Sequence, residues 1–243
     1  MKLRADQLAC ERGLCPSRAV AQRLIRDGRI RLIDGTPLRK PSQLIDGGTP
    51  LQLTAPEQYV SRGAYKLLAA LDAFDPPVTG RVVLDLGAST GGFTDLLLQR
   101  GAMRSYAVDV GTGQLHGKLR DDPRVVNLEQ TNAKQLDRAL IPEAIGILVA
   151  DVSFISLTKV LPPCAPLLAD DAWIMVLVKP QFEAGRDAIG SGGVVRDQGI
   201  QRKCVEDIIA FARNELGWRC IGTVPSPIKG QNGNQEYIAA FTP

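Results

Sequence analysis

The chain has 243 residues, of which 44% are hydrophobic, an ordinary composition for a soluble globular protein. This length is sufficient for one domain with a substantial core together with a smaller domain. The longest apolar run, 172–178, is far too short to span a bilayer, and the N-terminus lacks the apolar core of a signal peptide. We therefore expect a cytoplasmic protein that does not bind membranes.

The cysteines and the histidine argue against a metal centre. The five cysteines are odd in number and scattered, and their spacing is not that of a metal site. His116 is the only histidine of the sequence. We expect reduced thiols, as is usual in a cytosolic protein, and no bound metal.

The formal net charge of +3 is unevenly distributed along the chain. Residues 1–60 hold ten Lys and Arg against six Asp and Glu, whereas the remaining residues hold 19 against 20. All of the excess positive charge therefore lies in the N-terminal quarter. This pattern predicts a polyanion-binding module attached to a nearly neutral catalytic domain.

Residues 1–54 predict a small α+β unit. A first helix runs from about residue 5 to 12 and ends at Gly13, and a second follows the capping residue Ser17 and continues to Gly28. A hairpin over 31–38 and a last strand at 51–53 complete the unit. One face of the second helix is apolar. The opposite face is polar and basic, with Arg18, Gln22, Arg26 and Arg29.

This order of elements resembles the S4 RNA-binding domain, most clearly over 4–8, 13–18, 22–30 and 40–42. In that family the basic helix face and the hairpin bind structured RNA. The resemblance implies that Arg4, Arg18 and Lys40 contact RNA phosphates, and Arg62 at the start of the next unit is a further candidate. The residues alone leave open that this face is merely solvated.

Residues 55–60 predict a short linker, and 61–243 predict a second domain in which strands and helices alternate. The expected strands are 81–86, 104–109, 124–128, 145–150 and 172–178, and the expected helices are 61–73, 92–100, 155–168 and 200–216. Such alternation predicts an α/β fold, a mostly parallel, doubly wound sheet covered on both faces. Two closing strands, 219–224 and 236–241, predict an antiparallel edge. The glycine-rich stretch 185–199 is either a mobile loop over a substrate or an ordinary insertion.

A buried strand at 82–86 runs into a turn of small residues and glycines, followed by an amphipathic helix. Such a turn lets a ligand approach the backbone, and the start of the helix offers unpaired N–H groups. The next strand ends at Asp109, 22 residues after Gly87, where a carboxylate can accept hydrogen bonds from a ribose. The pattern predicts a nucleoside-cofactor site, with a plain tight turn as the alternative.

The turn favours S-adenosylmethionine over a dinucleotide. Ser89 stands where dinucleotide folds need a glycine for close approach of the pyrophosphate, and S-adenosylmethionine carries no phosphate. A nicotinamide oxidoreductase is therefore only the rival hypothesis. The expected cofactor-binding residues are Gly87, Ala88, Ser89, Thr90, Gly91, Gly92, Phe93, Asp109 and Asp151. Thr131 and Asn132 join them by analogy with the fold, although these two could equally form a turn.

Two ionisable residues directly follow buried strands: Asp151 after 147–150 and Lys179 after 174–178. Ligands of open α/β sheets bind outside the carboxyl ends of the strands. Each residue taken alone could be a helix cap or a surface charge. Because both stand at the same edge as Gly87, we expect them to face one crevice.

The motif Gly-Ala-Ser-Thr-Gly-Gly-Phe at 87–93, with Asp151 and Lys179-Pro180, resembles the RrmJ/FtsJ-type ribose 2′-O-methyltransferases, which have a Rossmann-like class I fold. Those enzymes use a Lys-Asp-Lys-Glu set, and the first Lys and the Glu match Lys66 and Glu236. With the S4-like unit and the segment 179–183, nearly the whole chain resembles the TlyA family of ribosomal-RNA cytidine-2′-O-methyltransferases, sometimes labelled haemolysins. Ser89-Thr90 departs from the Ala-Pro found in many members of the wider class.

The resemblance implies a methyl transfer from S-adenosylmethionine to a ribose 2′-hydroxyl of ribosomal RNA, by in-line attack of that hydroxyl, with ribosomal RNA or ribosomal subunits as partners. Lys179 would steer or accept the hydroxyl proton, Lys66 would stabilise the developing alkoxide, and Asp151 and Glu236 would orient these groups. Whether Lys179 is a general base or an electrostatic anchor stays open. A catalytically silent RNA-binding assembly factor is the non-enzymatic alternative. A membrane-lytic protein is disfavoured because no strongly amphipathic stretch is present.

Overall fold

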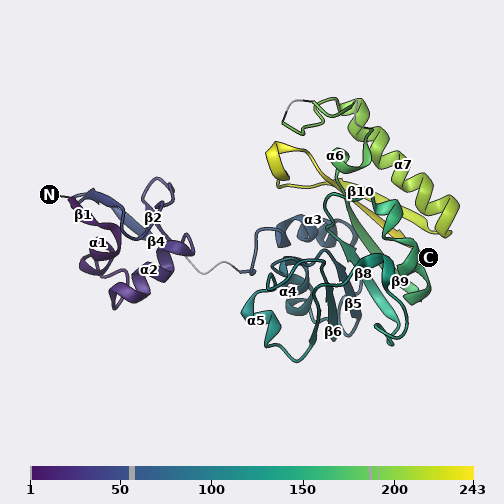
Figure 1. Ribbon diagram of the computed structural model, residues 1–243, viewed down its shortest axis with the longest axis horizontal. Helices are drawn as coiled ribbons and strands as arrows, with labels where there is room; N and C mark the ends of the chain where they lie inside the picture. Colours follow the sequence, from purple (N-terminus) through teal and green to yellow (C-terminus); the bar gives the residue numbers. More distant parts are fainter. Residues whose placement is uncertain (1, 55–57, 186–187, 191) are drawn as a thin grey trace. The chain divides into compact units, whose positions relative to one another are not determined.

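The computed structural model describes residues 2–54, 58–185, 188–190 and 192–243. The chain divides into two compact units, Met1–Gln58 and Tyr59–Pro243, which are described separately (Figure 1). Of the linker expected at 55–60, residues 55–57 lie outside the described residues. Tyr59 is buried in the second unit, and the backbone N–H of Val60 donates to the carboxylate of Asp95 at 2.8 Å. The second unit therefore begins two residues earlier than the sequence suggested.

The first unit packs two helices, α1 (Ala5–Glu11) and α2 (Arg18–Arg26), against short strands. As predicted, α2 begins after Ser17, whose hydroxyl accepts a hydrogen bond from a backbone N–H of the first turn. β2 (Ile30–Leu32) pairs with β4 (Leu51–Leu53), and β1 (Lys2–Arg4) pairs with β3 (Leu44–Asp46), both antiparallel. The second pair was not predicted, because strands of three residues are too short to show a period-2 pattern.

The hairpin predicted at 31–38 is reduced to one bridge between Arg31 and Pro37. Pro37 has no N–H to donate, so a ladder cannot continue through it. β2 pairs with β4 instead, across the unit. The core of the unit consists of small and aliphatic side chains from both helices and the strands: Ala5, Leu8, Ala9, Ala21, Leu24, Ile25, Ile30, Leu38 and Ile45.

The second unit is built on one seven-stranded sheet of order β10-β11-β9-β8-β5-β6-β7. Its strands are β5 (Val82–Leu86), β6 (Arg104–Val108), β7 (Val125–Leu128), β8 (Ile145–Ala150), β9 (Leu168–Val178), β10 (Arg219–Pro225) and β11 (Tyr237–Thr242). β5 to β9 run parallel, and β11 is antiparallel to both β9 and β10. The expected doubly wound α/β sheet with an antiparallel edge is confirmed.

Helices cover both faces of this sheet (Figure 1). α3 (Ala64–Phe74) and α4 (Gly92–Gln99) pack on one face, where side chains such as Val83 contribute to the core. α7 (Gln198–Leu216) packs on the other face, together with the side chains of Leu84 and Leu86. This alternation along β5 is the two-sided burial typical of a central parallel strand. Two short helices, α5 (Gly117–Arg120) and α6 (Pro180–Glu183), complete the unit.

The helix predicted at 155–168 is wrong. The segment forms two short 3₁₀ helices, η2 (Leu157–Lys159) and η3 (Pro162–Leu167), and β9 starts directly afterwards. Pro162, Pro163 and Pro166 lack the N–H groups that an α-helix interior requires, and their rings clash with the preceding turn. The other helices and strands predicted for this unit are present within a few residues of their expected bounds, apart from the earlier start of β9.

Candidate active site

The carboxyl ends of three neighbouring strands bring the candidate catalytic and cofactor residues together. β5 pairs in parallel with β8, and β8 with β9, so that Gly87, Asp151 and Lys179 all follow strand ends at the same edge. The backbone N–H of Asp151 donates to the carbonyl of Leu86 at 2.9 Å. A Cβ at Gly87 would lie 2.7 Å from the backbone oxygen of Asp151, and φ is +75°, so this position requires glycine.

Two lysines and two carboxylates form one connected cluster at this edge. Nζ of Lys179 lies 2.6 Å from Oδ1 of Asp151, and Nζ of Lys66 lies 2.7 Å from Oε2 of Glu236. Lys66 also lies 3.6 Å from Oδ2 of Asp151, which links the two pairs. The four residues come from the start of α3, the ends of β8 and β9, and the residue before β11. Separate segments of the chain thus converge on one point.

The cluster is largely removed from solvent, so its charges interact more strongly than surface charges do. The side chains of Lys179 and Glu236 are 8% and 2% exposed, and those of Lys66 and Asp151 are 13% and 21% exposed. Ser153 and Gln181 extend the network. Lys179 donates to the hydroxyl of Ser153 at 2.8 Å, and the amide of Gln181 donates to Glu236 at 3.4 Å.

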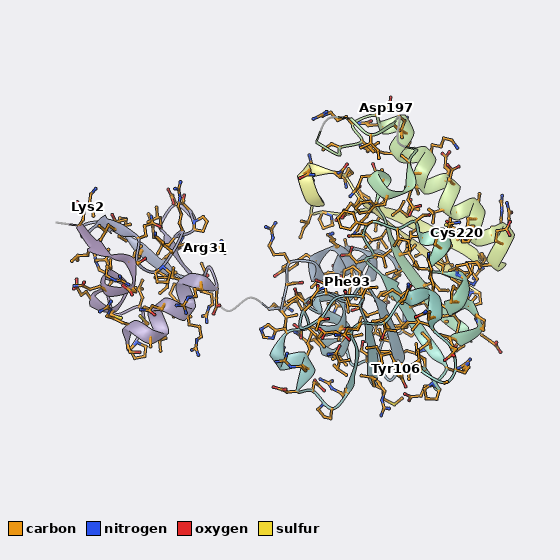
Figure 2. The ribbon with its side chains drawn as sticks, in the orientation of Figure 1. Lys2, Arg31, Phe93, Tyr106, Asp197 and Cys220 are labelled. Atoms are coloured by element: carbon orange, nitrogen blue, oxygen red, sulfur yellow. The ribbon has the colours of Figure 1, made fainter. Side chains whose placement is uncertain are left out.

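These residues line a cavity of about 300 Å³. Its wall also includes residues of the glycine-rich turn and Phe93, the buried residue near the start of α4 (Figure 2). The lining residues are Ser61, Gly63, Lys66, Asp85, Gly87, Ala88, Ser89, Thr90, Gly92, Phe93, Asp151, Ser153, Lys179, Gln181, Phe182 and Glu236. Gly91 is absent from this wall: a Cβ there would collide with Leu115 and Leu119, so its role is close packing.

Asp85 is a buried carboxyl group of this cavity that the sequence analysis did not single out. It lies within β5, and its Oδ2 accepts hydrogen bonds from the N–H and the hydroxyl of Thr94. Oδ1 is buried without a hydrogen-bond partner. Burial raises the pKa of Asp85 to about 7, against the opposing effect of the Thr94 bonds, and the nearby charges of Asp151 and Asp109 add to the increase. Asp85 could have been identified from the sequence, because it is a carboxylate within an otherwise apolar strand.

A second cavity of about 490 Å³ adjoins the first. Both have Gly87, Ser89, Asp151 and Ser153 in their walls. The second wall adds mostly apolar and small polar side chains: Val108, Asp109, Val110, Gln114, Thr131, Asn132, Ala133, Lys134, Val152, Phe154, Ile155 and Val160. The two cavities thus offer one polar and one more apolar compartment on either side of the Gly87 turn.

Asp109 lies at the end of β6 in the wall of the second cavity, as predicted for a ribose acceptor. It accepts hydrogen bonds from the backbone N–H groups of Ser89 at 2.9 Å and Gly111 at 2.8 Å. These bonds hold the turn against Asp109. The side chain of Gln114 also donates to Oδ1, at 3.5 Å. Because a carboxylate oxygen has two lone pairs, Oδ2 can still accept a bond from a ligand.

Thr131 and Asn132 line the same cavity, and their side chains also serve the local turn. Asn132 accepts a bond from the N–H of Lys134 at 3.0 Å, capping a 3₁₀ turn, and the hydroxyl of Thr131 donates to the carbonyl of Glu129. The turn considered from the sequence is therefore confirmed, and the two residues also line the cavity. Their side chains hold the loop that forms the wall.

The candidate RNA-binding residues of the first unit differ in whether a carboxylate of the same unit pairs with them. Arg4 forms two hydrogen bonds to buried Asp6, at 2.9 and 3.0 Å, and Arg18 lies 3.5 Å from the same carboxylate. The Arg4 guanidinium holds the pKa of Asp6 far below its usual range. Lys40 is exposed, as is Arg62 in the second unit. Asp6 thus contacts the guanidinium groups of both arginines, which remain partly exposed.

Within the described residues, no helix is both long and apolar enough to cross a membrane. The same part of the chain contains no group of three or more His, Cys, Asp and Glu side chains arranged to hold a metal ion.

Comparisons with known proteins agree with this architecture. The FtsJ-like methyltransferase family matches residues 59–242, and the S4 domain family matches residues 3–51. Among curated relatives, the "16S/23S rRNA (cytidine-2'-O)-methyltransferase TlyA" of Mycobacterium tuberculosis is 49% identical, with coverage of 98% of this chain and 88% of the relative. "Hemolysin A" of Brachyspira hyodysenteriae is 38% identical, with coverage of 98% and 99%.

Solved structures are similar as well. A putative hemolysin from Streptococcus thermophilus matches with a TM-score of 0.77 at 44% identity, over 99% of this chain and 88% of that one. A putative hemolysin from Lactococcus lactis matches with a TM-score of 0.74 at 43% identity, over 76% and 89% of the two chains. With a family match over most of its length and relatives this similar, the chain belongs to the TlyA family, in which an S4 domain precedes an FtsJ-like methyltransferase domain.

Proposed function

We propose that this protein is an S-adenosylmethionine-dependent methyltransferase that modifies the ribose 2′-hydroxyl of cytidine in ribosomal RNA. One observation carries the proposal: Lys66, Asp151, Lys179 and Glu236 meet in a single cavity beside the Gly87 turn. The activity that the Mycobacterium tuberculosis relative is named for supports the choice of substrate.

The residues around the two cavities fit this cofactor. Asp109 at the end of β6 suits a ribose diol, and the adjoining cavity of about 490 Å³ offers an apolar wall for an adenine. The unpartnered Oδ1 of Asp85 in the polar cavity suits the ammonium of a methionine moiety. When bound, the cofactor supplies a methyl group on a positively charged sulfur.

The lysines then act on the ribose oxygen that receives the methyl group. A lysine ammonium has three N–H donors, and Lys179 donates one of them to Ser153 while it forms an ion pair with Asp151. A further donor is available to hydrogen-bond the 2′-oxygen. As this hydroxyl gives up its proton to solvent, its oxygen would take the methyl group, whose bond to sulfur would break. The ammonium groups of Lys179 and Lys66 would stabilise the negative charge that develops on the oxygen. Asp151 and Glu236 hold the lysines in place.

We infer from its ion pair with Asp151 at 2.6 Å that Lys179 acts as an electrostatic anchor. Replacement by arginine tests this role against that of a general base. Lys179→Arg keeps a positive charge but cannot lose a proton near neutral pH. An anchor predicts that this variant keeps more activity than Lys179→Met, whereas a base predicts that the two variants are equally inactive.

The main experiment incubates the protein with unmodified 16S and 23S rRNA transcripts and methyl-labelled S-adenosylmethionine, and then identifies the labelled nucleoside after digestion. We expect label on the ribose of cytidine, and loss of the label with Lys179→Met. Label on a base, or undiminished transfer by the variant, would contradict the proposal. RNA binding without any transfer would indicate the catalytically silent assembly factor instead.

Basic residues of the first unit, and Arg62 of the second unit, supply the RNA contacts in this proposal. The exposed Lys40, Arg18 and Arg62 are placed for phosphate contacts, which position an RNA and carry little sequence information. Arg4 contributes with its exposed edge only, since Asp6 occupies its other side.

A further inference from the structure

A separate groove of about 730 Å³ lies in the second unit between the start of α7 and the connection from β10 to β11. It shares no residue with the two cavities described above. Its walls contain the residues Val194, Val195, Arg196, Gln198, Gln201, Arg202, Pro225, Lys229, Asn232, Gly233, Gln235 and Tyr237. None of the roles assigned so far uses these side chains.

Buried polar side chains hold the two walls together. Asn234, which is 2% exposed, accepts a bond from the N–H of Val195 at 3.0 Å and donates to the carbonyl of Gly193 at 2.9 Å. Gln201, which is 7% exposed, donates to the carbonyl of Val195 at 2.7 Å and accepts from the hydroxyl of Tyr237 at 2.9 Å. The described part of the glycine-rich stretch is thus bonded to the β10–β11 connection, and the groove is formed in advance of any ligand.

The charges in this groove have one sign. Arg196, Arg202 and Lys229 line it, and its walls contain no Asp or Glu. All three cations are exposed, and none forms an ion pair with another described residue. The carboxylate next in sequence, Asp197, caps α7 by accepting from the N–H groups of Gly199 and Ile200 (Figure 2). Such a concentration of positive charge favours an anionic ligand, and its amide side chains add neutral donors.

Some residues that line the groove are sequence neighbours of a residue in the catalytic cluster. Glu236 lines the catalytic cavity, while its neighbours Gln235 and Tyr237 line the groove. Side chains alternate in direction along extended backbone, so one strand end separates the two sites. Gly230, the residue after Lys229, packs so closely on the carboxylate of Glu236 that a side chain there would collide with it. A polymer in the groove would therefore pass close to the residue that holds Lys66.

We propose that this basic groove binds the sugar-phosphate backbone of the RNA substrate beside the nucleotide that enters the catalytic cavity. The inference rests on the proposed function, because it takes RNA as the substrate. A repeating anion suits three unpaired cations spread over two walls, and the amides of Gln198 and Asn232 suit phosphate and ribose oxygens. The groove increases the affinity for RNA and fixes the position of its backbone, without contacting the bases.

The test compares two double variants of the full-length protein. Arg202→Gln with Lys229→Gln removes one cation from each wall of the groove. Arg213→Gln with Arg219→Gln removes two exposed cations from the last turn of α7 and the start of β10, and is the matched control. Measurements are the affinity for unmodified rRNA transcripts at several salt concentrations, kcat and KM for RNA, and the affinity for S-adenosylmethionine.

For the groove variant we expect RNA affinity to fall on the order of tenfold, and the slope of log K against log salt to decrease by about 1.5, as for two lost phosphate contacts. KM for RNA should rise by a similar factor, while kcat and cofactor affinity stay near wild type. The control variant should keep wild-type affinity. The charge-preserving exchange Arg202→Lys with Lys229→Arg should also keep most of the affinity, which separates charge from folding.

Wild-type RNA affinity and salt slope in the groove variant would overturn the inference, as would an equal loss in the control variant. Weaker activity on whole ribosomal subunits with unchanged affinity for protein-free rRNA would also overturn it, and would point to a protein partner. A wild-type protein that binds rRNA but transfers no methyl group would refute the proposed function, whereas the affinity measurements would still decide the role of the groove.

Discussion

The two units of this protein use buried carboxylates in different ways. In the first unit, Asp6 is buried, but its partners Arg4 and Arg18 are 40% and 56% exposed. In the second unit, Asp151 and Glu236 pair with Lys66 and Lys179, which are themselves only 13% and 8% exposed. One arrangement holds exposed guanidinium groups at a surface, and the other encloses opposite charges in a cavity. Burial of the cation therefore separates a surface open to solvent from a site that can stabilise a reaction.

The largest expected effect comes from removing a buried cation. Lys179→Met keeps the length of the side chain but leaves Asp151 without its closest partner, at 2.6 Å. We expect kcat for rRNA methylation to fall by roughly a thousandfold or more, as when a charge-stabilising donor is lost. The measurement is single-turnover methyl transfer with saturating cofactor.

The matched control is Arg81→Met, because Arg81 lies just before β5 at the opposite edge of the sheet and pairs with exposed Asp171. It should keep wild-type activity. A Lys179→Met enzyme that retains a tenth of the wild-type rate would show that enclosure of the cation is not what drives the reaction.

A buried carboxyl group without a cation should make stability depend on pH. The pKa of Asp85 is raised to about 7, above the value of an unfolded aspartate, so the folded state binds the proton more tightly. The contribution of Asp85 is fully present below the unfolded pKa and is lost as pH rises toward 7. The loss amounts to at most about 4 kcal/mol.

The variant Asp85→Asn cannot ionise, so its free energy of unfolding should fall less than that of the wild type between pH 4.5 and pH 8. Denaturant titration of the cofactor-free protein at several pH values measures this difference. Parallel curves of unfolding free energy against pH for the two proteins would show that Asp85 is not protonated in the folded state.

The buried carboxylate of the first unit should contribute to stability rather than to catalysis. Asp6→Asn weakens the bonds from Arg4 and Gln22 and removes the charge that pairs with Arg18. We expect a loss of about 2 kcal/mol in the first unit. Hydrogen exchange of the two units would locate the effect. Equal loss of protection in the second unit would contradict the independence of the two units.

The smallest effect should come from a pair in which both partners are exposed. Lys203 and Asp207 are 71% and 61% exposed and lie one turn apart on α7, at 2.8 Å. Such pairs are screened by water and salt. Lys203→Gln should leave the midpoint of thermal unfolding unchanged, and a clear decrease would show that exposure is a poor guide to the contribution of these ion pairs.

The sequence was informative wherever a local pattern had a direct structural cause. Alternating apolar strands and helices predicted the sheet, and the glycine-rich turn before α4 predicted the position of the cavities. It was misleading at 155–168, where apolar residues suggested a helix despite three prolines. It was uninformative for β1 and β3, which have three residues each.

The sequence by itself determined the type of most elements of the second unit, the charge of each unit and the residues at the strand ends, because these depend on neighbouring positions. Only the tertiary structure decided which charges are enclosed and which remain exposed. Lys66 and Glu236 lie 170 positions apart, and their contact at 2.7 Å depends on α3 and β11 packing at one sheet edge. The basic groove likewise depends on buried Asn234 and Gln201 joining distant segments. Burial and long-range hydrogen bonds are properties of the packed chain, so local sequence patterns do not reveal them.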